Sequence, residues 1–308
     1  MFINLALSNE QRLLFYKFFL AILSVYGVYA DQSSYKWTES LPDPWTISNE
    51  QLDLYLPRFH KMHPDYHDRL IALNLWRLGT PYGIFCLGEE QGVDKDPIIR
   101  FDTSDCTVHV LTTIALAESY TFQNAKDAMI KIHYKPDQYG TITPTFRSRW
   151  HFTSDRLLNH PNTVNITSLI SSQEDLENIK IELNKKQNGS QFLNLDWTSF
   201  ESIDYIPIQK LSDDILIKLP SICGAAFVKK DYFRNGIVIA HEGYLINSRD
   251  LIHASSIEKK TVKVDLISYL KEDKNTFRFD GIMFFDIKEA QKNEYKFIKS
   301  RIWFLQIE

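Results

Sequence analysis

The sequence predicts an α+β fold in which a central helix packs against an antiparallel sheet. Residues 101–119 contain an apolar run without Gly or Pro, and its apolar residues recur at helical spacing on both faces, which indicates a buried helix. The C-terminal third instead contains short segments rich in Val and Ile and separated by turn residues, which is typical of an antiparallel sheet. The expected strands are 223–228, 236–246, 251–254, 260–264 and 281–287, with a helix over 266–270.

Composition and charge narrow the class of protein. The chain has 308 residues, of which 44% are hydrophobic, so it can bury a sizeable core. The formal net charge of −4 at pH 7 leaves no basic surplus for phosphate backbones, so we do not expect nucleic acid as a partner. The three cysteines cannot all pair, and their spacing does not match a zinc site.

Residues 1–30 are typical of an export signal. Arg12 and Lys17 precede an apolar run over 18–28, and a cleavage site follows at Ala30. The run is short for a membrane span, so we expect no stable span once the signal is removed. Glu10 and the long stretch before Lys17 leave an uncleaved anchor or a buried helix as alternatives. We therefore expect an exported, periplasmic protein with one domain over 31–308.

The region before the central helix is predicted to hold a broken helix and a loop. Residues 48–51 resemble a helix cap, and the helix over 52–78 is interrupted at Pro57 and Pro64 and stopped by Gly79. Three histidines of this segment lie near helical spacing and could form a metal-binding face: His60, His63 and His67. The intervening Pro64 disfavours that geometry. In the loop over 80–100, Tyr82 either points its hydroxyl at a developing oxyanion or simply packs as an aromatic side chain.

Beyond the central helix, the sequence predicts a helix over 125–134, turns over 136–145 and an outer amphipathic helix over 171–187. The stretch 146–155 between them combines polar and aromatic residues. Arg149 in this stretch can clamp a carboxylate through paired hydrogen bonds, or can be an ordinary surface arginine.

Cys106 stands at the expected start of the central helix, where Ser104 or Asp105 can cap it. A thiol at a helix N-terminus lies next to unpaired N–H groups and the positive end of the dipole. Both lower its pKa and favour a nucleophile. The alternative is a buried cysteine that acts only as a small hydrophobic residue.

Two histidines fall on strands that a hairpin turn over 247–250 would make neighbours. His241 and His253 can then face the same side, so that one takes the proton of Cys106 and the other fixes its tautomer. Taken alone, either residue can equally be a core histidine with satisfied hydrogen bonds.

These motifs resemble a known family. Asp105-Cys106-Thr107, His241-Glu242-Gly243 and Ile252-His253-Ala254, in that order, resemble the NlpC-type papain-like cell-wall hydrolases, whose catalytic set is Cys, His and His. Further stretches narrow the resemblance to the N-acetylmuramoyl-L-alanine amidase-like branch, formerly a domain of unknown function: Gly79-Thr80-Pro81-Tyr82, Leu87-Gly88-Glu89, and Ser148-Arg149-Trp150-His151-Phe152 with Asp155. Departures include His109, one turn after Cys106, and Glu242 beside the base, where the branch usually has valine.

The resemblance implies a papain-like NlpC-type fold, with the nucleophile helix on an antiparallel sheet or half-barrel and extra N-terminal helices. It implies a cysteine amidase that cuts peptidoglycan fragments between N-acetylmuramic acid and L-alanine, with Cys106 as nucleophile, His241 as base and His253 orienting it. No cofactor or metal ion is implied. The expected substrate-binding residues are Tyr82, Asp105 and Arg149, together with His151 or Asp155, which would hold the Arg149 guanidinium.

Two alternatives remain at the level of sequence. One is an endopeptidase that cuts D-glutamyl to diamino-acid bonds on the same scaffold and recognises a free L-alanine amine, for which Asp105 is the candidate. The other is a catalytically inactive module that binds muropeptides.

Overall fold

The computed structural model describes residues 35–273 and 276–290, and the chain divides into two compact units, Met1–Pro42 and Asp43–Glu308. Within the first unit, residues 35–42 are described and contain a helical segment, in which Ser40 N–H donates to the Trp37 carbonyl (3.0 Å). The predicted export signal lies outside the described residues. Of the helices that the structure describes, none has the length and apolar character needed to span a membrane.

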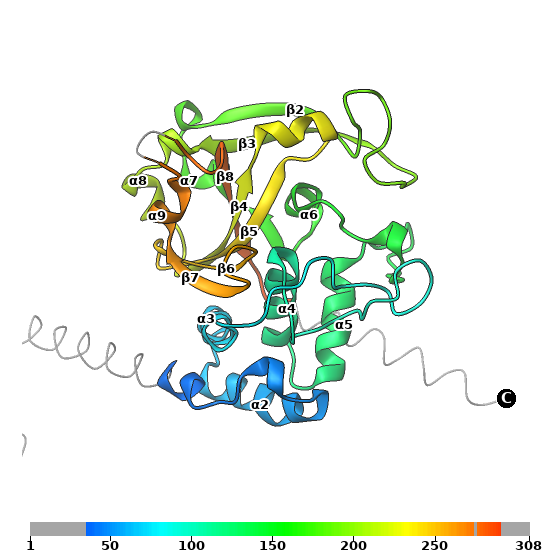
Figure 1. Ribbon diagram of the computed structural model, residues 1–308, viewed down its shortest axis with the longest axis vertical. Helices are drawn as coiled ribbons and strands as arrows, with labels where there is room; N and C mark the ends of the chain where they lie inside the picture. The colour runs from blue at the N-terminus through cyan, green and yellow to red at the C-terminus, as the bar shows by residue number, and fades with distance from the viewer. Residues whose placement is uncertain (1–34, 274–275, 291–308) are drawn as a thin grey trace, which may run out of the picture. The chain divides into compact units, whose positions relative to one another are not determined.

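The second unit combines helices with one antiparallel sheet, as the sequence predicts (Figure 1). Its α-helices are α2 (Asn49–Met62), α3 (Tyr66–Trp76), α4 (Cys106–Ala117), α5 (Phe122–His133), α6 (Thr153–Asn159), α7 (Thr167–Ile170), α8 (Asp213–Leu216) and α9 (Leu266–Leu270). Its strands are β1 (Thr163–Asn165), β2 (Glu177–Leu183), β3 (Ser199–Pro207), β4 (Ile222–Val228), β5 (Ile239–Ile246), β6 (Asp250–Ser255), β7 (Lys260–Asp265) and β8 (Gly281–Ile287).

The strands form one sheet in the order β2-β3-β8-β4-β5-β6-β7, with β1 paired to β8. The two histidine strands are neighbours in it, because β5 and β6 form the predicted hairpin, with Ile246 opposite Asp250. Asn247 and Ser248 in the turn adopt positive φ angles of 50° and 59°, a conformation that asparagine tolerates better than most residues. The hairpin prediction is therefore confirmed.

Helices cover both faces of the central strands (Figure 1). Side chains alternate along β5, so Tyr244 points toward α4, where its hydroxyl donates to the Val110 carbonyl (2.9 Å). Leu245, the next residue, joins the hydrophobic core on the other face, to which α7, α8 and α9 contribute. The alternation places His241 on the same side of β5 as Leu245, and Glu242 on the side of α4.

Each of the N-terminal helices α2 and α3 begins at a capping residue. Ser48 and Gln51 form the expected capping box at the start of α2, and Pro57 lies inside this helix without ending it. Asp65 caps α3 by accepting from the N–H groups of His67 and Asp68 (2.8 and 3.1 Å). The predicted single broken helix is therefore two complete helices.

The outer helix predicted over 171–187 is wrong. Ser172 and Asp175 do form a capping box, but it starts only one 3₁₀ turn, Gln173–Asp175. The next residues form β2, which pairs along its whole length with β3, a strand that the sequence reading missed. The sequence of β2 does alternate as a strand should, with apolar residues at Ile179, Ile181 and Leu183. The charged residues between them resemble the polar face of an amphipathic helix.

Candidate active site

Cys106 is the first residue of α4, and the carboxylate of Asp105 fixes the start of this helix. Asp105 Oδ1 accepts from the Val108 N–H (2.8 Å), and Oδ2 accepts from the Phe85 N–H in the loop before it (2.9 Å). The predicted helix start and cap are confirmed. Because both carboxylate oxygens already hold backbone N–H groups, Asp105 anchors the loop to the helix, and its role toward a substrate amine stays a prediction.

The thiol of Cys106 lies next to the backbone of β5. Burial raises the pKa of Cys106 to about 12, and the charges of Asp105 and Glu242 act in the same direction. The neighbouring Glu242 N–H and Thr107 hydroxyl act in the opposite direction on this pKa but do not prevail. The prediction that this pKa is lowered is therefore wrong, because burial, together with the charges of Asp105 and Glu242, raises it.

His241 and His253 form a hydrogen-bonded pair. His241 Nε2 and His253 Nδ1 are 2.9 Å apart, and the two rings meet edge to face with centroids 4.8 Å apart. Burial lowers the pKa of His241 to about 3 and that of His253 to about 4, so both rings are neutral at pH 7. Phe227 and Tyr269 pack against the His241 ring. The expectation that the two histidines face one side of the sheet is confirmed.

The hydrogen bond between the two histidines leaves Nδ1 of His241 available. Among the described residues, Nδ1 of His241 has no hydrogen-bond partner, and the Cys106 thiol has no hydrogen bond to either ring. The thiol lies beside the N–H of Glu242, which directly follows His241 along β5. The nucleophile candidate thus neighbours the residue of β5 that directly follows His241.

Glu242 ties this strand to two helices. Its Oε1 accepts from the hydroxyls of Thr107 in α4 (2.9 Å) and Thr153 in α6 (3.0 Å), and its Oε2 forms an ion pair with Arg156 Nη2 (2.5 Å). The side chains of Glu242 and Arg156 are each 1% exposed. A buried charge pair of this kind is tolerated only when the partners satisfy one another. Glu242 therefore fixes the two helices against the histidine strand.

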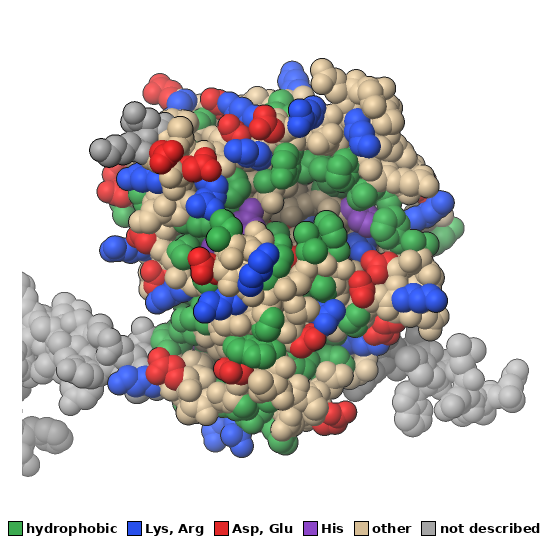
Figure 2. All heavy atoms as spheres, viewed as in Figure 1, with side chains coloured by type: hydrophobic (Ala, Val, Ile, Leu, Met, Phe, Trp, Pro, Cys, Tyr) green, Lys and Arg blue, Asp and Glu red, His purple; other side chains and the backbone are tan. Residues whose placement is uncertain are grey.

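A cleft of about 260 Å³ opens beside the imidazole pair. It is lined by Tyr82, Lys229, Tyr232, Ala240, His241, His253, Ala254, Ser255, Ser256, Ile257, Tyr269, Arg278 and Phe279. Cys106 is not part of this lining. Burial raises the pKa of Tyr82 and Tyr269, which both line the cleft, and a thiolate at Cys106 would raise each further, so the sulfur lies near the cleft. The face shown in Figure 2 is hollowed near its centre, with histidine side chains on either side and hydrophobic side chains around them.

A family model described as AmiA-like, N-acetylmuramoyl-L-alanine amidase-like, matches residues 74–277, which is more than half of the chain. The chain belongs to this amidase-like family. Membership supports a hydrolase that acts on peptidoglycan-type substrates. The matched segment contains Cys106, His241 and His253.

Several solved structures resemble this member of the amidase-like family. A protein of Legionella pneumophila is 20% identical over 77% of this chain and 95% of its own, with a TM-score of 0.61. An N-acetylmuramoyl-L-alanine amidase of Bacteroides uniformis is 22% identical over 71% of this chain and 98% of its own, with a TM-score of 0.54. At these identities the likeness shows the fold alone. No curated protein matches the chain.

The predicted substrate-binding residues of this amidase-like chain fall in two places. Tyr82 lines the cleft, whereas Arg149, His151 and Asp155 do not. Arg149 Nη1 forms an ion pair with Asp94 Oδ2 (2.9 Å). The prediction that His151 or Asp155 holds this guanidinium is wrong, because Asp155 pairs with Lys135 and the His151 ring bonds to the Phe146 carbonyl. A role for all three in binding substrate stays a prediction.

Three groups that line the cleft beside the imidazoles were not predicted from the sequence. Tyr269 comes from α9, and Arg278 and Phe279 come from the segment between α9 and β8. No motif marked them, since only the fold of the C-terminal strands brings them to His241. The one available signal was the aromatic and basic character of this short connection.

Three of the other histidines contact groups within the fold. His109, the departure from the family pattern, is buried, with its Nε2 2.9 Å from Asn74 Oδ1 and its ring edge-on to Tyr244. His60 and His67 lie near the carbonyls of Ser119 and Ile287, at 3.1 and 3.3 Å from Nε2. Within residues 35–273 and 276–290, no group of three or more His, Cys, Asp or Glu side chains is arranged to hold a metal ion.

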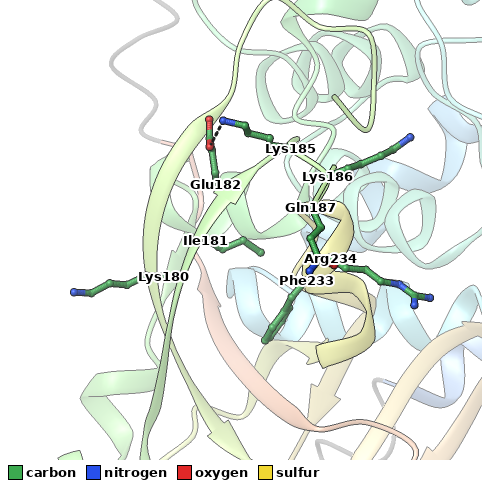
Figure 3. Close-up of a pocket in the computed structure, with 8 residues that line it drawn as sticks. All are labelled: Lys180, Ile181, Glu182, Lys185, Lys186, Gln187, Phe233 and Arg234. Carbon is green, nitrogen blue, oxygen red and sulfur yellow. Dashed lines mark ion pairs between the residues drawn. The ribbon is translucent and has the colours of Figure 1, made fainter. Parts of the chain in front are cut away.

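A second hollow, of about 480 Å³, lies away from the histidines, between β2 with its following loop and the 3₁₀ helix η5 (Lys230–Asn235) (Figure 3). Its cations do not converge: Lys180 and Arg234 point to opposite sides, and Lys185 pairs with Glu182 (2.7 Å). We therefore place the active site at the cleft and not here.

Proposed function

We propose that this protein is a cysteine amidase that cleaves the amide between the lactyl group of N-acetylmuramic acid and L-alanine in peptidoglycan fragments. The observation that carries the proposal is the hydrogen-bonded pair of His241 and His253 on a strand whose next residue, Glu242, neighbours Cys106 at the start of α4. Cysteine, base and orienting group in this order also fit the NlpC-type papain-like fold, which we propose for the domain. Family membership supplies the substrate class.

The protonation states define how the reaction starts. A thiol with a pKa raised to about 12 and an imidazole with a pKa lowered to about 3 are both neutral at pH 7. Cys106 therefore transfers its proton to Nδ1 of His241 as the sulfur attacks the carbonyl carbon, not before. In this step His253 Nδ1 accepts from the Nε2–H of His241, which leaves Nδ1 of His241 as the acceptor for the thiol proton.

The later steps use the same groups. The backbone N–H of Cys106 and the Tyr82 hydroxyl stabilise the oxyanion, and protonated His241 gives its proton to the leaving L-alanine amine. His241 then activates a water molecule, which hydrolyses the thioester and restores the thiol. The charge that His241 gains is transient, because burial disfavours the charged imidazole.

Incubation with purified muropeptides tests the proposal, with products identified by mass spectrometry. We expect release of peptides that begin with L-alanine, and no turnover by Cys106→Ala or Cys106→Ser. Both variants should keep the thermal unfolding midpoint, because a small residue at a helix start changes little packing. Turnover by either variant would contradict the cysteine mechanism.

The same experiment separates the alternatives. Cleavage only after D-glutamate would show the endopeptidase, and binding without cleavage would show an inactive muropeptide-binding module. Export to the periplasm is a separate proposal, which rests on residues 1–30. Cell fractionation of the full chain, with a variant lacking those residues as control, tests it.

A further inference from the structure

The cleft beside the imidazole pair has an unbalanced charge. Two cations, Lys229 and Arg278, line it, and no Asp or Glu is part of its described lining. A polar cleft with cations and no carboxylates favours a substrate that brings a negative charge.

Arg278 is held with its guanidinium over the aromatic floor of the cleft. Its Cζ lies 4.7 Å from the centroid of the Tyr269 ring, and its Nε donates to the Tyr269 carbonyl (3.2 Å). The Tyr269 ring is itself 4.5 Å from the ring of His253, centroid to centroid. Lys229 fixes the backbone at this point, because its Nζ donates to the Arg278 carbonyl (2.9 Å). Arg278 is therefore a preorganised cation next to the imidazole pair.

The guanidinium keeps donors available for a ligand. In the part of the chain that the structure describes, Arg278 has no carboxylate partner, and only its Nε makes a hydrogen bond. Arg149, the arginine that the sequence favoured as a carboxylate clamp, is instead paired with Asp94 and lies outside the cleft lining. The two Nη groups of Arg278 match the two oxygens of a carboxylate.

We propose that Arg278 binds a carboxylate of the peptide stem and so makes the enzyme selective for stems that carry a free α-carboxylate on the second residue. The inference rests on the proposed function. Peptidoglycan stems place such a carboxylate one residue beyond the scissile amide, within the span of a cleft next to the histidines. Arg278 is thus a specificity-determining residue, and Lys229 positions it.

Two matched glycopeptides test this. One is N-acetylmuramyl-L-alanyl-D-glutamate with a free α-carboxylate, and the other is the same compound with an α-carboxamide. We expect the native protein to prefer the acid by roughly 10- to 100-fold in kcat/KM, the range for a hydrogen bond to a charged group. In Arg278→Gln the preference should fall to within about threefold, a change seen mainly in KM because the contact forms in the ground state.

Arg234→Gln is the matched control, because it removes the same charge from the second hollow and should keep the full preference. Equal turnover of the two glycopeptides by the native protein overturns the proposal without any variant. A preference that survives in Arg278→Gln but disappears in Arg149→Lys also overturns it and assigns the clamp to Arg149.

Binding to Cys106→Ala, measured by calorimetry, separates this inference from the proposed function. Failure of the native protein to release L-alanyl peptides from either compound, with tighter binding of the acid to Cys106→Ala, refutes the amidase but supports the carboxylate site. Release from both compounds, with equal affinities, supports the amidase and refutes the site.

Discussion

The buried ion pair between Glu242 and Arg156 predicts a large and strongly coupled effect on stability. Each side chain is 1% exposed, and the Arg156 Nη2 meets Glu242 Oε2 at 2.5 Å. Removing one partner leaves the other charge buried without compensation, which costs about 3–5 kcal/mol. Glu242→Gln should fall near the lower end, about 3 kcal/mol, because the amide can still bond to Arg156 and to the hydroxyls of Thr107 and Thr153.

A double-mutant cycle measured by urea unfolding tests this reasoning. Glu242→Gln and Arg156→Met should each destabilise the protein, whereas the double variant leaves no unpaired charge and should cost less than the sum by about 2–3 kcal/mol. Arg147 and Asp196 form an exposed pair at 3.5 Å, and the same cycle there should show little coupling. Additive losses at Glu242 and Arg156, within about 0.5 kcal/mol, would refute the coupling.

Three further predictions concern the active site and the dependence of stability on pH. Glu242→Gln should lower the pKa of Cys106, because the Glu242 charge adds to the effect of burial in raising it. In a Cys86→Ser background, the rate at which a thiol reagent alkylates Cys106 should therefore begin to rise at a lower pH than in the parent. An unchanged pH profile would argue against the charge effect. His241→Ala should abolish muropeptide turnover, whereas His253→Asn should reduce it without abolishing it, since an amide can still hold the His241 ring; equal losses would contradict the separate roles. Burial lowers the pKa of His160 to about 4, so the unfolded chain binds more protons between pH 6.5 and 4, and stability falls as the pH falls through that window. His160→Gln should remove about 2 kcal/mol of the loss between pH 7 and 5, measured by urea unfolding at pH 7, 6 and 5, and an unchanged dependence of stability on pH would contradict this assignment.

Local signals predicted the helix that begins at Cys106 and the hairpin that joins the histidine strands. Asp105 caps α4 as expected, because a cap depends on residues within one turn of each other. The hairpin followed from the short turn between two apolar segments, and it places His241 and His253 on the same side of the sheet. Both features involve contacts that are close in sequence or that a single turn determines.

The features that sequence reasoning missed depend on distant contacts. Arg149 pairs with Asp94, which is 55 positions away and has no pattern that links it to Arg149. The pKa of Cys106 also depends on Glu242, on a strand that nothing in the 101–119 stretch could locate. Arg278 reaches the cleft only because α9 and β8 flank it. Pairings across the fold need the three-dimensional arrangement, which one sequence does not supply.

The hydrogen bond from Thr107 to Glu242 joins the residue after Cys106 to the residue after His241, across 135 positions of the chain. A contact between such distant segments forms only when the helical layer docks on the sheet. Closing so large a loop costs conformational entropy, which the other contacts between helix and sheet must offset. A refolding chain can therefore complete the β5–β6 hairpin, and with it the imidazole pair, while the thiol is still apart from it. Hydrolytic activity should return with the docking of α4, after the strands have formed.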